Sequence, residues 1–242
     1  MIRALAAALA LAAALPAAAQ FSGGGPSPRY GSFQMSLETY RPNIDSEFGG
    51  GPGPYERAFG GKRNLMFRFD VAYSLLVSYG TLDVGLGAGY WEKYGHGFAQ
   101  DTGARVSDPT ALKVYPTRLS LTYRFDVLSN QYRWFPLAPY ARVALDRYWW
   151  WVNNGAGGTA NASGKSGSGA TNGYSVTGGV ALDLGAIDTM LAREMDRDTG
   201  INHTYFFVEL SKSYVKDFGS SKSWNLSDDR KVSFAGGLLF AF

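Results

Sequence analysis

Eight stretches of the sequence alternate, residue by residue, between apolar side chains and small or polar ones. In one stretch Leu82, Val84 and Leu86 occupy one parity, while Asp83 and Gly85 occupy the other. Successive side chains of a β-strand point to opposite faces, so this period of two predicts strands with one apolar face and one small or polar face. The eight stretches are residues 33–38, 65–73, 82–91, 118–126, 140–146, 174–183, 204–211 and 231–242.

The residue types on the second face distinguish two architectures. A soluble β-protein would bury the apolar face and expose a face dense in Lys and Glu. Here the second face holds Gly, Ser, Ala and Thr with isolated charges of both signs. Small residues and neutralised charges are typical of a narrow lumen, and an uncharged face is compatible with lipid. We therefore expect an all-β fold, a transmembrane antiparallel up-and-down β-barrel of about eight strands, with a short helix in one periplasmic link.

Charges inside such a barrel need partners of opposite sign. Three pairs share one parity of a strand and are expected to neutralise each other: Arg68 with Asp70 and Arg124 with Asp126, two residues apart, and Arg142 with Asp146, four residues apart. The charged residues that we expect in the lumen are Arg68, Asp70, Asp83, Arg118, Arg124, Asp126, Arg142, Asp146, Asp183 and Glu209.

Aromatic residues make up 15% of the chain, and 31 residues are Gly. Aromatic girdles are expected where the wall of a membrane barrel meets lipid headgroups. The densest cluster is predicted to form an aromatic rim at the outer end of the fifth strand; the alternative is a carbohydrate- or hydrophobe-binding rim beneath the loop 152–172. The rim residues are Tyr148, Trp149, Trp150 and Trp151.

The start of the chain has the parts of a secretory signal in order: Arg3, an Ala/Leu run over residues 5–15, Pro16, and three Ala residues at 17–19. We expect residues 1–19 to be a cleaved signal peptide, 20–30 a flexible N-terminal segment, and 31–242 the outer-membrane barrel. Cys is absent, which excludes disulfides and thiol chemistry. The net charge of +3 comes from scattered residues, so no nucleic-acid partner is expected.

Long connections follow the odd stretches, at residues 42–63, 94–114, 152–172 and 215–229. An N-terminus in the periplasm would place all of these loops outside the cell. Within the link 185–200, Ile187, Met190, Leu191 and Met195 recur at helical spacing. The helix over residues 186–199 is either a periplasmic turn helix or a plug; an eight-stranded barrel leaves little lumen, which favours the turn helix.

The most specific motif is the last strand, which carries alternating apolar residues up to an aromatic residue. It resembles the C-terminal β-signal of bacterial outer-membrane proteins, and the chain resembles the small barrels typified by the OmpA transmembrane domain, OmpX and OmpW, including lineage-specific families of myxobacteria. The resemblance implies a Gram-negative outer-membrane location, contact with outer-membrane lipid and lipopolysaccharide, recognition by the barrel-assembly machinery, and a monomer. The residues that carry this assembly signal are Phe242, Phe240, Leu238 and Phe234.

No constellation of catalytic residues closes in the sequence. Lipid A deacylases of similar architecture use a His-x-Ser pair, whereas His203 is followed by Thr204 and Tyr205. The segment 196–200 begins like a calcium loop but lacks the later carboxylates. We therefore predict no catalytic, cofactor-binding or metal-binding residues and no enzyme. The expected function is a structural or interaction barrel that presents surface loops; a narrow pore or hydrophobic-solute conduit is the alternative, and a lipid-modifying enzyme a weaker one.

Overall fold

The computed structural model describes residues 29–49, 52–98, 105–132, 134–154, 158–162, 165–220 and 223–242. Eight antiparallel strands close into a barrel in the order β1-β10-β9-β8-β5-β4-β3-β2, so each strand pairs with its neighbours in the chain and β1 pairs with β10. The predicted up-and-down barrel of about eight strands is confirmed. The strands are β1 (Gly31–Tyr40), β2 (Asn64–Val77), β3 (Thr81–Phe98), β4 (Arg105–Arg124), β5 (Leu137–Asn153), β8 (Ser168–Asp183), β9 (His203–Val215) and β10 (Ser233–Ala241).

Several strands are longer than the sequence pattern indicates. The predicted loop 94–114 is largely strand, because β3 runs to Phe98 and β4 starts at Arg105. Gly95, Gly97 and Pro109 interrupt the alternation there, which hid the strands from a periodicity argument. The predicted loop 152–172 is similarly shortened by β8 and contains the two-stranded β6 (Asn161–Ala162) and β7 (Lys165–Ser166).

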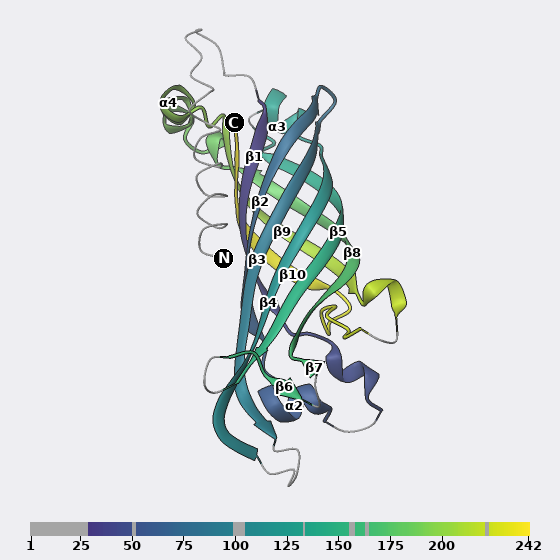
Figure 1. The fold of residues 1–242 in the computed structure, drawn as a ribbon. Coiled ribbons are helices and arrows are strands. Elements are labelled where there is room, and N and C mark those ends of the chain that lie inside the picture. The colour runs from purple at the N-terminus through teal and green to yellow at the C-terminus, as the bar shows by residue number, and fades with distance from the viewer. Residues whose placement is uncertain are drawn as a thin grey trace.

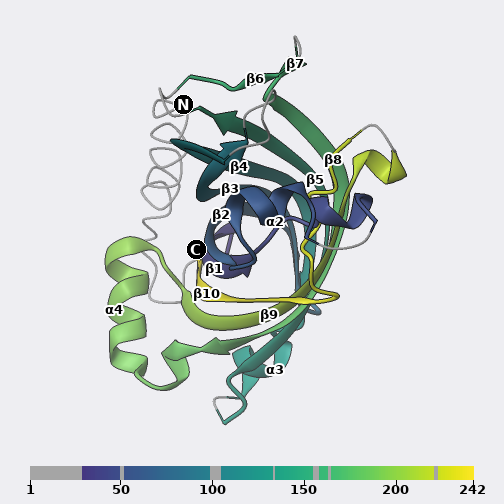
Figure 2. The ribbon, with the colours of Figure 1, turned by 90° about the horizontal axis from the view of Figure 1, so that it is seen from below.

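The two ends of the barrel differ (Figure 1). At the terminal end lie the start of β1, the end of β10, α3 (Val127–Gln131) and α4 (Thr189–Thr199). At the loop end lie β6, β7 and α2 (Pro54–Phe59), and α2 crosses the mouth when the barrel is seen end-on (Figure 2).

The helix α4 is capped as its sequence suggests. The Asp188 side chain accepts hydrogen bonds from the backbone N–H groups of Met190 and Leu191, and Gly200 ends the helix with φ 72°. None of its residues is buried, and it lies at the terminal end outside the barrel wall (Figure 1). It is therefore a turn helix and not a plug. No helix in the described ranges is long and apolar enough to cross a membrane.

The two faces of the barrel wall follow the parity of the strands. Large apolar side chains such as Leu86, Leu145 and Phe234 are more than half exposed on the outside. Aromatic residues border this apolar band at both ends. The loop-end belt comprises Tyr90, Tyr94, Tyr115, Trp149, Trp151, Tyr174 and Tyr214. The terminal-end belt comprises Tyr30, Tyr73, Tyr79, Tyr123, Phe125, Tyr132 and Trp134.

The spacing between the belts is close to the thickness of a hydrocarbon layer. On β4, Tyr115 and Tyr123 are separated by eight residues (123 minus 115), or about 27 Å of strand. A tilt of about 40° reduces this to roughly 20 Å along the barrel axis, close to the ~25 Å apolar band of outer-membrane barrels.

Inside the barrel, β3 contributes glycines where arginines need room. A Cβ at Gly87 would lie 2.8 Å from Cγ of Arg118 and closer still to the Asp70 carboxylate. A Cβ at Gly89 would lie 3.0 Å from Cγ of Arg68. The small face of β3 therefore provides the volume that two long charged side chains fill.

The fold leaves two sequence predictions untested. The proposed signal peptide, residues 1–19, and most of the flexible segment 20–30 lie outside the described residues, of which Arg29 and Tyr30 are the first.

Candidate functional site

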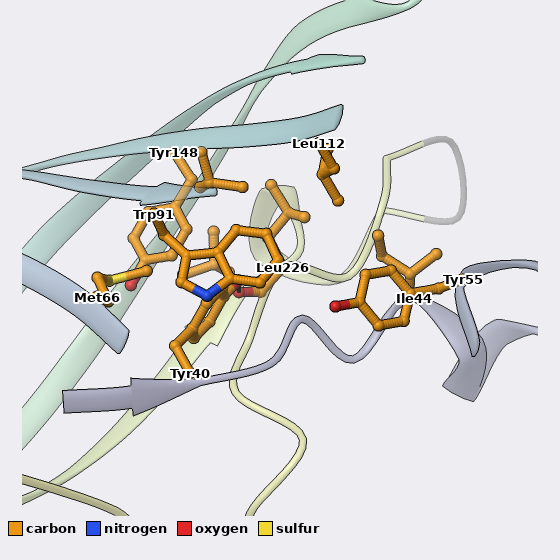
Figure 3. Close-up of a cluster of buried hydrophobic side chains, with 10 residues drawn as sticks. Tyr40, Ile44, Tyr55, Met66, Trp91, Leu112, Tyr148 and Leu226 are labelled. Atoms are coloured by element: carbon orange, nitrogen blue, oxygen red, sulfur yellow. Dashed lines mark hydrogen bonds between the residues drawn. The ribbon is translucent and has the colours of Figure 1, made fainter. Parts of the chain in front are cut away.

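The loop-end mouth of the barrel is filled by apolar side chains, shown in Figure 3 and here named the mouth cluster. Strands and loops far apart in the sequence contribute to it: Tyr40 ends β1, Tyr55 lies on α2, and Leu226 comes from the loop between β9 and β10. Burying such large side chains is the dominant favourable contribution to folding of a region like this. The buried members are Tyr40, Ile44, Tyr55, Met66, Trp91, Leu112, Val114, Tyr148, Val215 and Leu226.

Tyr40 lies at the centre of the mouth cluster. Its ring meets Trp91 edge-on, with centroids 5.3 Å apart, and contacts Tyr148 at 6.2 Å. Its hydroxyl donates a hydrogen bond of 2.6 Å to the backbone carbonyl of Leu226. The first strand and the last loop are thus joined across 186 positions of sequence. The mouth is closed by specific packing and not by loose loops.

The first connection, predicted as a long Gly/Pro loop, folds into η1 (Ile44–Glu47) and α2. Asp45 joins the two: its carboxylate oxygens accept hydrogen bonds from the backbone N–H groups of Tyr55 (2.8 Å) and Glu56 (2.9 Å). A carboxylate at these N–H groups also complements the helix dipole. Burial raises the pKa of the Tyr55 hydroxyl well above its usual value, so this side chain stays neutral.

Charged residues fasten the first and last connections to each other around the mouth cluster. The Arg63 guanidinium donates to the carboxylates of Asp228 and Asp229. Arg41 lies 3.2 Å from Glu56 and 3.7 Å from Asp229. These ion pairs lie at the loop end and hold the first and last connections together beside the mouth cluster.

The aromatic run 148–151 is divided between the two faces of β5. Tyr148 is 1% exposed and points into the lumen, so its assignment to an outward rim was wrong. The assignment of Trp150 to that rim was also wrong: it packs against the mouth cluster and stacks on Trp224, with centroids 4.1 Å apart and an interplanar angle of 18°. Trp149 and Trp151 lie on the outward parity, in the loop-end belt. Strand alternation demands this division, since a run of four residues cannot share one face.

The ten charged residues expected in the lumen all lie on its inner face, and Arg68 alone among them is not fully buried. Two of the three expected pairs are wrong. Arg68 donates to Glu38 at 2.7 Å, and Arg142 lies 3.2 Å from Glu209. Residues two and four apart on a strand are about 7 Å and 13 Å apart at Cα, whereas Glu38 on the neighbouring strand and Glu209 one strand beyond the neighbour come closer.

The middle of the lumen holds two ion pairs, each of which joins two strands that flank a third. Arg118 binds Asp70 with two hydrogen bonds of 2.6 Å, a geometry that suits the planar guanidinium. Arg142 donates to Glu209, and it also reaches Thr122 at 3.0 Å and Gln34 at 2.6 Å. These two pairs satisfy most of the polar atoms that they bury.

These ion pairs separate two polar cavities. The cavity towards the loop end is lined by Arg118 and Glu209, while the cavity towards the terminal end is lined by their partners Asp70 and Arg142. The cavities measure about 10 Å³ and 20 Å³, room for about one water molecule each. The two ion pairs therefore partition this part of the lumen.

Towards the terminal end, Arg124 lies 3.5 Å from Asp83 and 3.6 Å from Asp126. The pair Arg124/Asp126 is the one expected pair that the structure contains. Asp126 also accepts hydrogen bonds from Thr81 at 2.7 Å and from Arg29 at 2.9 Å. This network closes the lumen beside the terminal end.

The two histidines lie at opposite ends of the barrel. His203 pairs with Asp183 at 2.8 Å beside the terminal end, and Ser211 lies eight residues (211 minus 203) further along β9. His96 lies near the far end of β3. Among the described residues, no three potential metal ligands come together.

The sequence patterns missed several residues that close the lumen. Glu38 stands on the polar parity of the first stretch, and that position was the signal for its role. Tyr40, Tyr55 and Leu226 gave no comparable signal, because they lie outside the alternating stretches and meet only when the connections fold back over the mouth.

Of the proposed assembly-signal residues, Phe234 is half-exposed on the outer face and Phe242 is buried beside Gly31. The backbone of Phe242 exchanges hydrogen bonds with Gly31, which extends the β1–β10 pairing by one step. Recognition of these residues by an assembly machinery stays a prediction.

No family model and no curated protein matches the sequence. Among solved structures, Neisserial surface protein A is 14% identical with a TM-score of 0.46, covering 90% of this chain and 99% of its own. The N-terminal β-barrel domain of Pseudomonas aeruginosa OprF is 11% identical with a TM-score of 0.41, covering 89% and 100%. Ail of Yersinia pestis is 10% identical with a TM-score of 0.38, covering 88% and 99%. These neighbours are small outer-membrane barrels, and none of these similarities identifies an activity or ligand for this chain.

Proposed function

We propose that the protein is an integral outer-membrane barrel with a closed lumen, which holds its folded loop end outside the cell as a platform for interactions. The mouth cluster is the observation that carries this proposal. Buried side chains from the first and last connections seal the mouth, and ion pairs partition the lumen beneath it. A barrel built in this way supports a surface and offers no continuous path to solutes.

The outer face supports a membrane location. Large apolar side chains are exposed between two aromatic belts whose separation suits a hydrocarbon layer. In water, an exposed apolar band of this extent would drive aggregation. The loop end is placed outside because outer-membrane barrels have longer extracellular loops and short periplasmic turns, such as the β2–β3 turn at residues 78–80.

Export by a signal peptide at residues 1–19, insertion by the barrel-assembly machinery and a monomeric state complete the proposal. The pairing of β1 with β10 leaves no strand edge open in the barrel, which removes one route to oligomers. No cofactor and no enzymatic step enters it.

Insertion and conductance test the proposal separately. The protein refolded into lipid vesicles should resist protease except at the loop end, and should migrate faster on unboiled than on boiled SDS gels. A chain that stays in the aqueous phase, or that protease degrades throughout, contradicts the membrane location.

In planar bilayers, the wild type should show no steady single-channel conductance. The variant Asp70→Ala/Arg118→Ala/Arg142→Ala/Glu209→Ala removes both ion pairs without leaving one of their charges unpaired, and it serves as the control for a widened lumen. Brief openings in this variant would show that the recording reports on the lumen. Steady conductance of the wild type would contradict the closed barrel and support a narrow pore through the two cavities.

A further inference from the structure

The outward face of the barrel carries very few charged side chains. Within the described strands, the charged residues on the outward parity are Glu92, Lys113, Arg147 and Lys212, together with Arg105 at the far tip of β4. Lys113 and Glu92 form an ion pair of 3.2 Å. Arg105 lies ten residues (115 minus 105) beyond Tyr115, well past the loop-end belt.

Arg147 and Lys212 are therefore distinctive. They lie on β5 and β9, the two strands that flank β8, on one side of the barrel (Figure 2). In register, Arg147 is opposite Asn172 and Lys212 is opposite Val176, so the two cations bracket Tyr174 on the strand between them. Both lie at the height of the loop-end belt, where lipid headgroups meet the barrel wall.

Aromatic rings hold both cations in place. The Arg147 guanidinium lies 4.3 Å from the centroid of Trp149, and the Lys212 ammonium lies 5.5 Å from the centroid of Tyr214. Tyr214 in turn stacks on Tyr174, with centroids 5.0 Å apart. The Lys212 ammonium also donates a hydrogen bond of 3.1 Å to the backbone carbonyl of Arg230, and the charge of Arg147 acts on Asp217. Cation–π contacts orient the charged groups without neutralising them, so less side-chain entropy is lost when an anion binds.

The geometry points to a binding site for a phosphorylated sugar headgroup of an outer-leaflet glycolipid, with Arg147 and Lys212 contacting phosphate and the Tyr174–Tyr214 stack contacting the sugar. Two cations separated by one strand suit a headgroup with more than one phosphate, and the guanidinium matches phosphate oxygens in bidentate geometry. Exposed faces of Tyr rings offer the flat apolar surface against which a sugar ring packs. The site rests on the proposed function, since it requires the loop end to face the outer leaflet.

The test uses the full chain refolded in detergent micelles and titrated with purified lipopolysaccharide. The readouts are the ratio of bound to free protein in native mass spectrometry and the temperature at which the folded gel band disappears. Wild type should bind and gain several degrees of thermal stability. Arg147→Gln/Lys212→Gln should bind about tenfold more weakly, as expected for the loss of charge-assisted contacts. Raising the salt concentration should weaken wild-type binding.

Arg193→Gln/Arg197→Gln is the matched control, because it removes the same charge from exposed positions on α4 at the opposite end. This variant should bind like wild type. Enzymatically dephosphorylated lipopolysaccharide should bind no better to wild type than native lipopolysaccharide binds to Arg147→Gln/Lys212→Gln.

Three results would overturn the site. They are equal binding by Arg147→Gln/Lys212→Gln and wild type, equal binding of dephosphorylated and native lipopolysaccharide, and equal binding of phosphatidylglycerol, which lacks the phosphorylated sugar. If the protein inserts into vesicles but shows one of these results, the glycolipid site fails while the membrane barrel stands. If the protein does not insert, the proposed function itself fails.

Discussion

The mouth cluster and the two ion pairs beneath it fill neighbouring parts of the same lumen by different means. These pairs, Arg118 with Asp70 and Arg142 with Glu209, are here named the ion-pair layer. The mouth cluster joins side chains from connections and strand ends, and it is stabilised by apolar burial. The ion-pair layer joins side chains from within the strands, and its stability depends on each charge keeping its partner. Substitutions in the mouth cluster should therefore lower the free energy of unfolding in proportion to the side-chain volume removed. Removing one charge of the ion-pair layer should cause a large loss of stability, and removing its partner as well should restore most of it.

The largest effect should come from breaking one pair in the ion-pair layer. Asp70→Leu leaves Arg118 buried without its bidentate partner and should lower the free energy of unfolding by about 3–5 kcal/mol. The double variant Asp70→Leu/Arg118→Met removes both charges and should regain most of this loss. Urea titration in lipid vesicles, followed by the folded band on unboiled gels, measures both variants. A double variant as unstable as the single one would contradict the ion-pair account.

A cavity in the mouth cluster should have the next largest effect. Trp91 is fully buried against Tyr40, so Trp91→Ala should destabilise the barrel by about 3 kcal/mol in the same titration. Trp91→Phe is the control. The Trp91 ring nitrogen has no hydrogen-bond partner among the described residues, so its loss should cost little. A loss as large for Phe as for Ala would argue against packing as the cause.

A smaller effect should follow from cutting the hydrogen bond between the first strand and the last loop. Tyr40→Phe keeps the ring and leaves the carbonyl of Leu226 without its donor, at a cost of about 1–2 kcal/mol. Limited proteolysis should also cleave the loop 215–229 faster in this variant. Unchanged stability and unchanged cleavage would show that ring packing alone closes the mouth.

The smallest effect should depend on pH and lie outside both regions. Partial burial alone would raise the pKa of Asp217. Hydrogen bonds from Ser223 and Asn172, together with the charge of Arg147, outweigh this effect, so the pKa lies below its ordinary value of 3.8. The stabilisation is therefore present above that pH and is lost as the pH falls through the lowered pKa. Asp217→Asn should cost less than about 1 kcal/mol at pH 7, and this cost should shrink at lower pH. A cost that is independent of pH would assign it to the hydrogen bonds alone.

The sequence predicted the barrel wall well because strand parity is a local property. Arg118 and Asp183 could be placed in the lumen from their positions in alternating stretches alone. Their partners could not be assigned in this way. Arg142 binds Glu209, which is 67 positions away in the sequence. Whether these two side chains meet in space depends on strand order and register around the whole barrel.

The mouth cluster could not be predicted from the sequence, for a related reason. Tyr55 lies on a short helix within a Gly/Pro-rich stretch, and Leu226 lies in a polar loop without periodicity. Their burial arises only where two connections meet over a mouth whose width the strands set. Trp150 shows the same limit on a smaller scale: it was assigned to the outward rim with its neighbours, and its stack on Trp224 depends on the fold of the last loop.

The glycines on the inner face of β3 have a consequence for how relatives of this chain diverge. Gly87 and Gly89 leave space that Arg118 and Arg68 occupy, so the cross-section of the lumen is a fixed volume shared between strands. A methyl group gained at Gly87 requires atoms to be lost at Arg118 or Asp70 on the neighbouring strands. In an alignment of related barrels, these positions should therefore covary in size as well as in charge, with a larger residue on β3 accompanied by a shorter one at the position of Arg118.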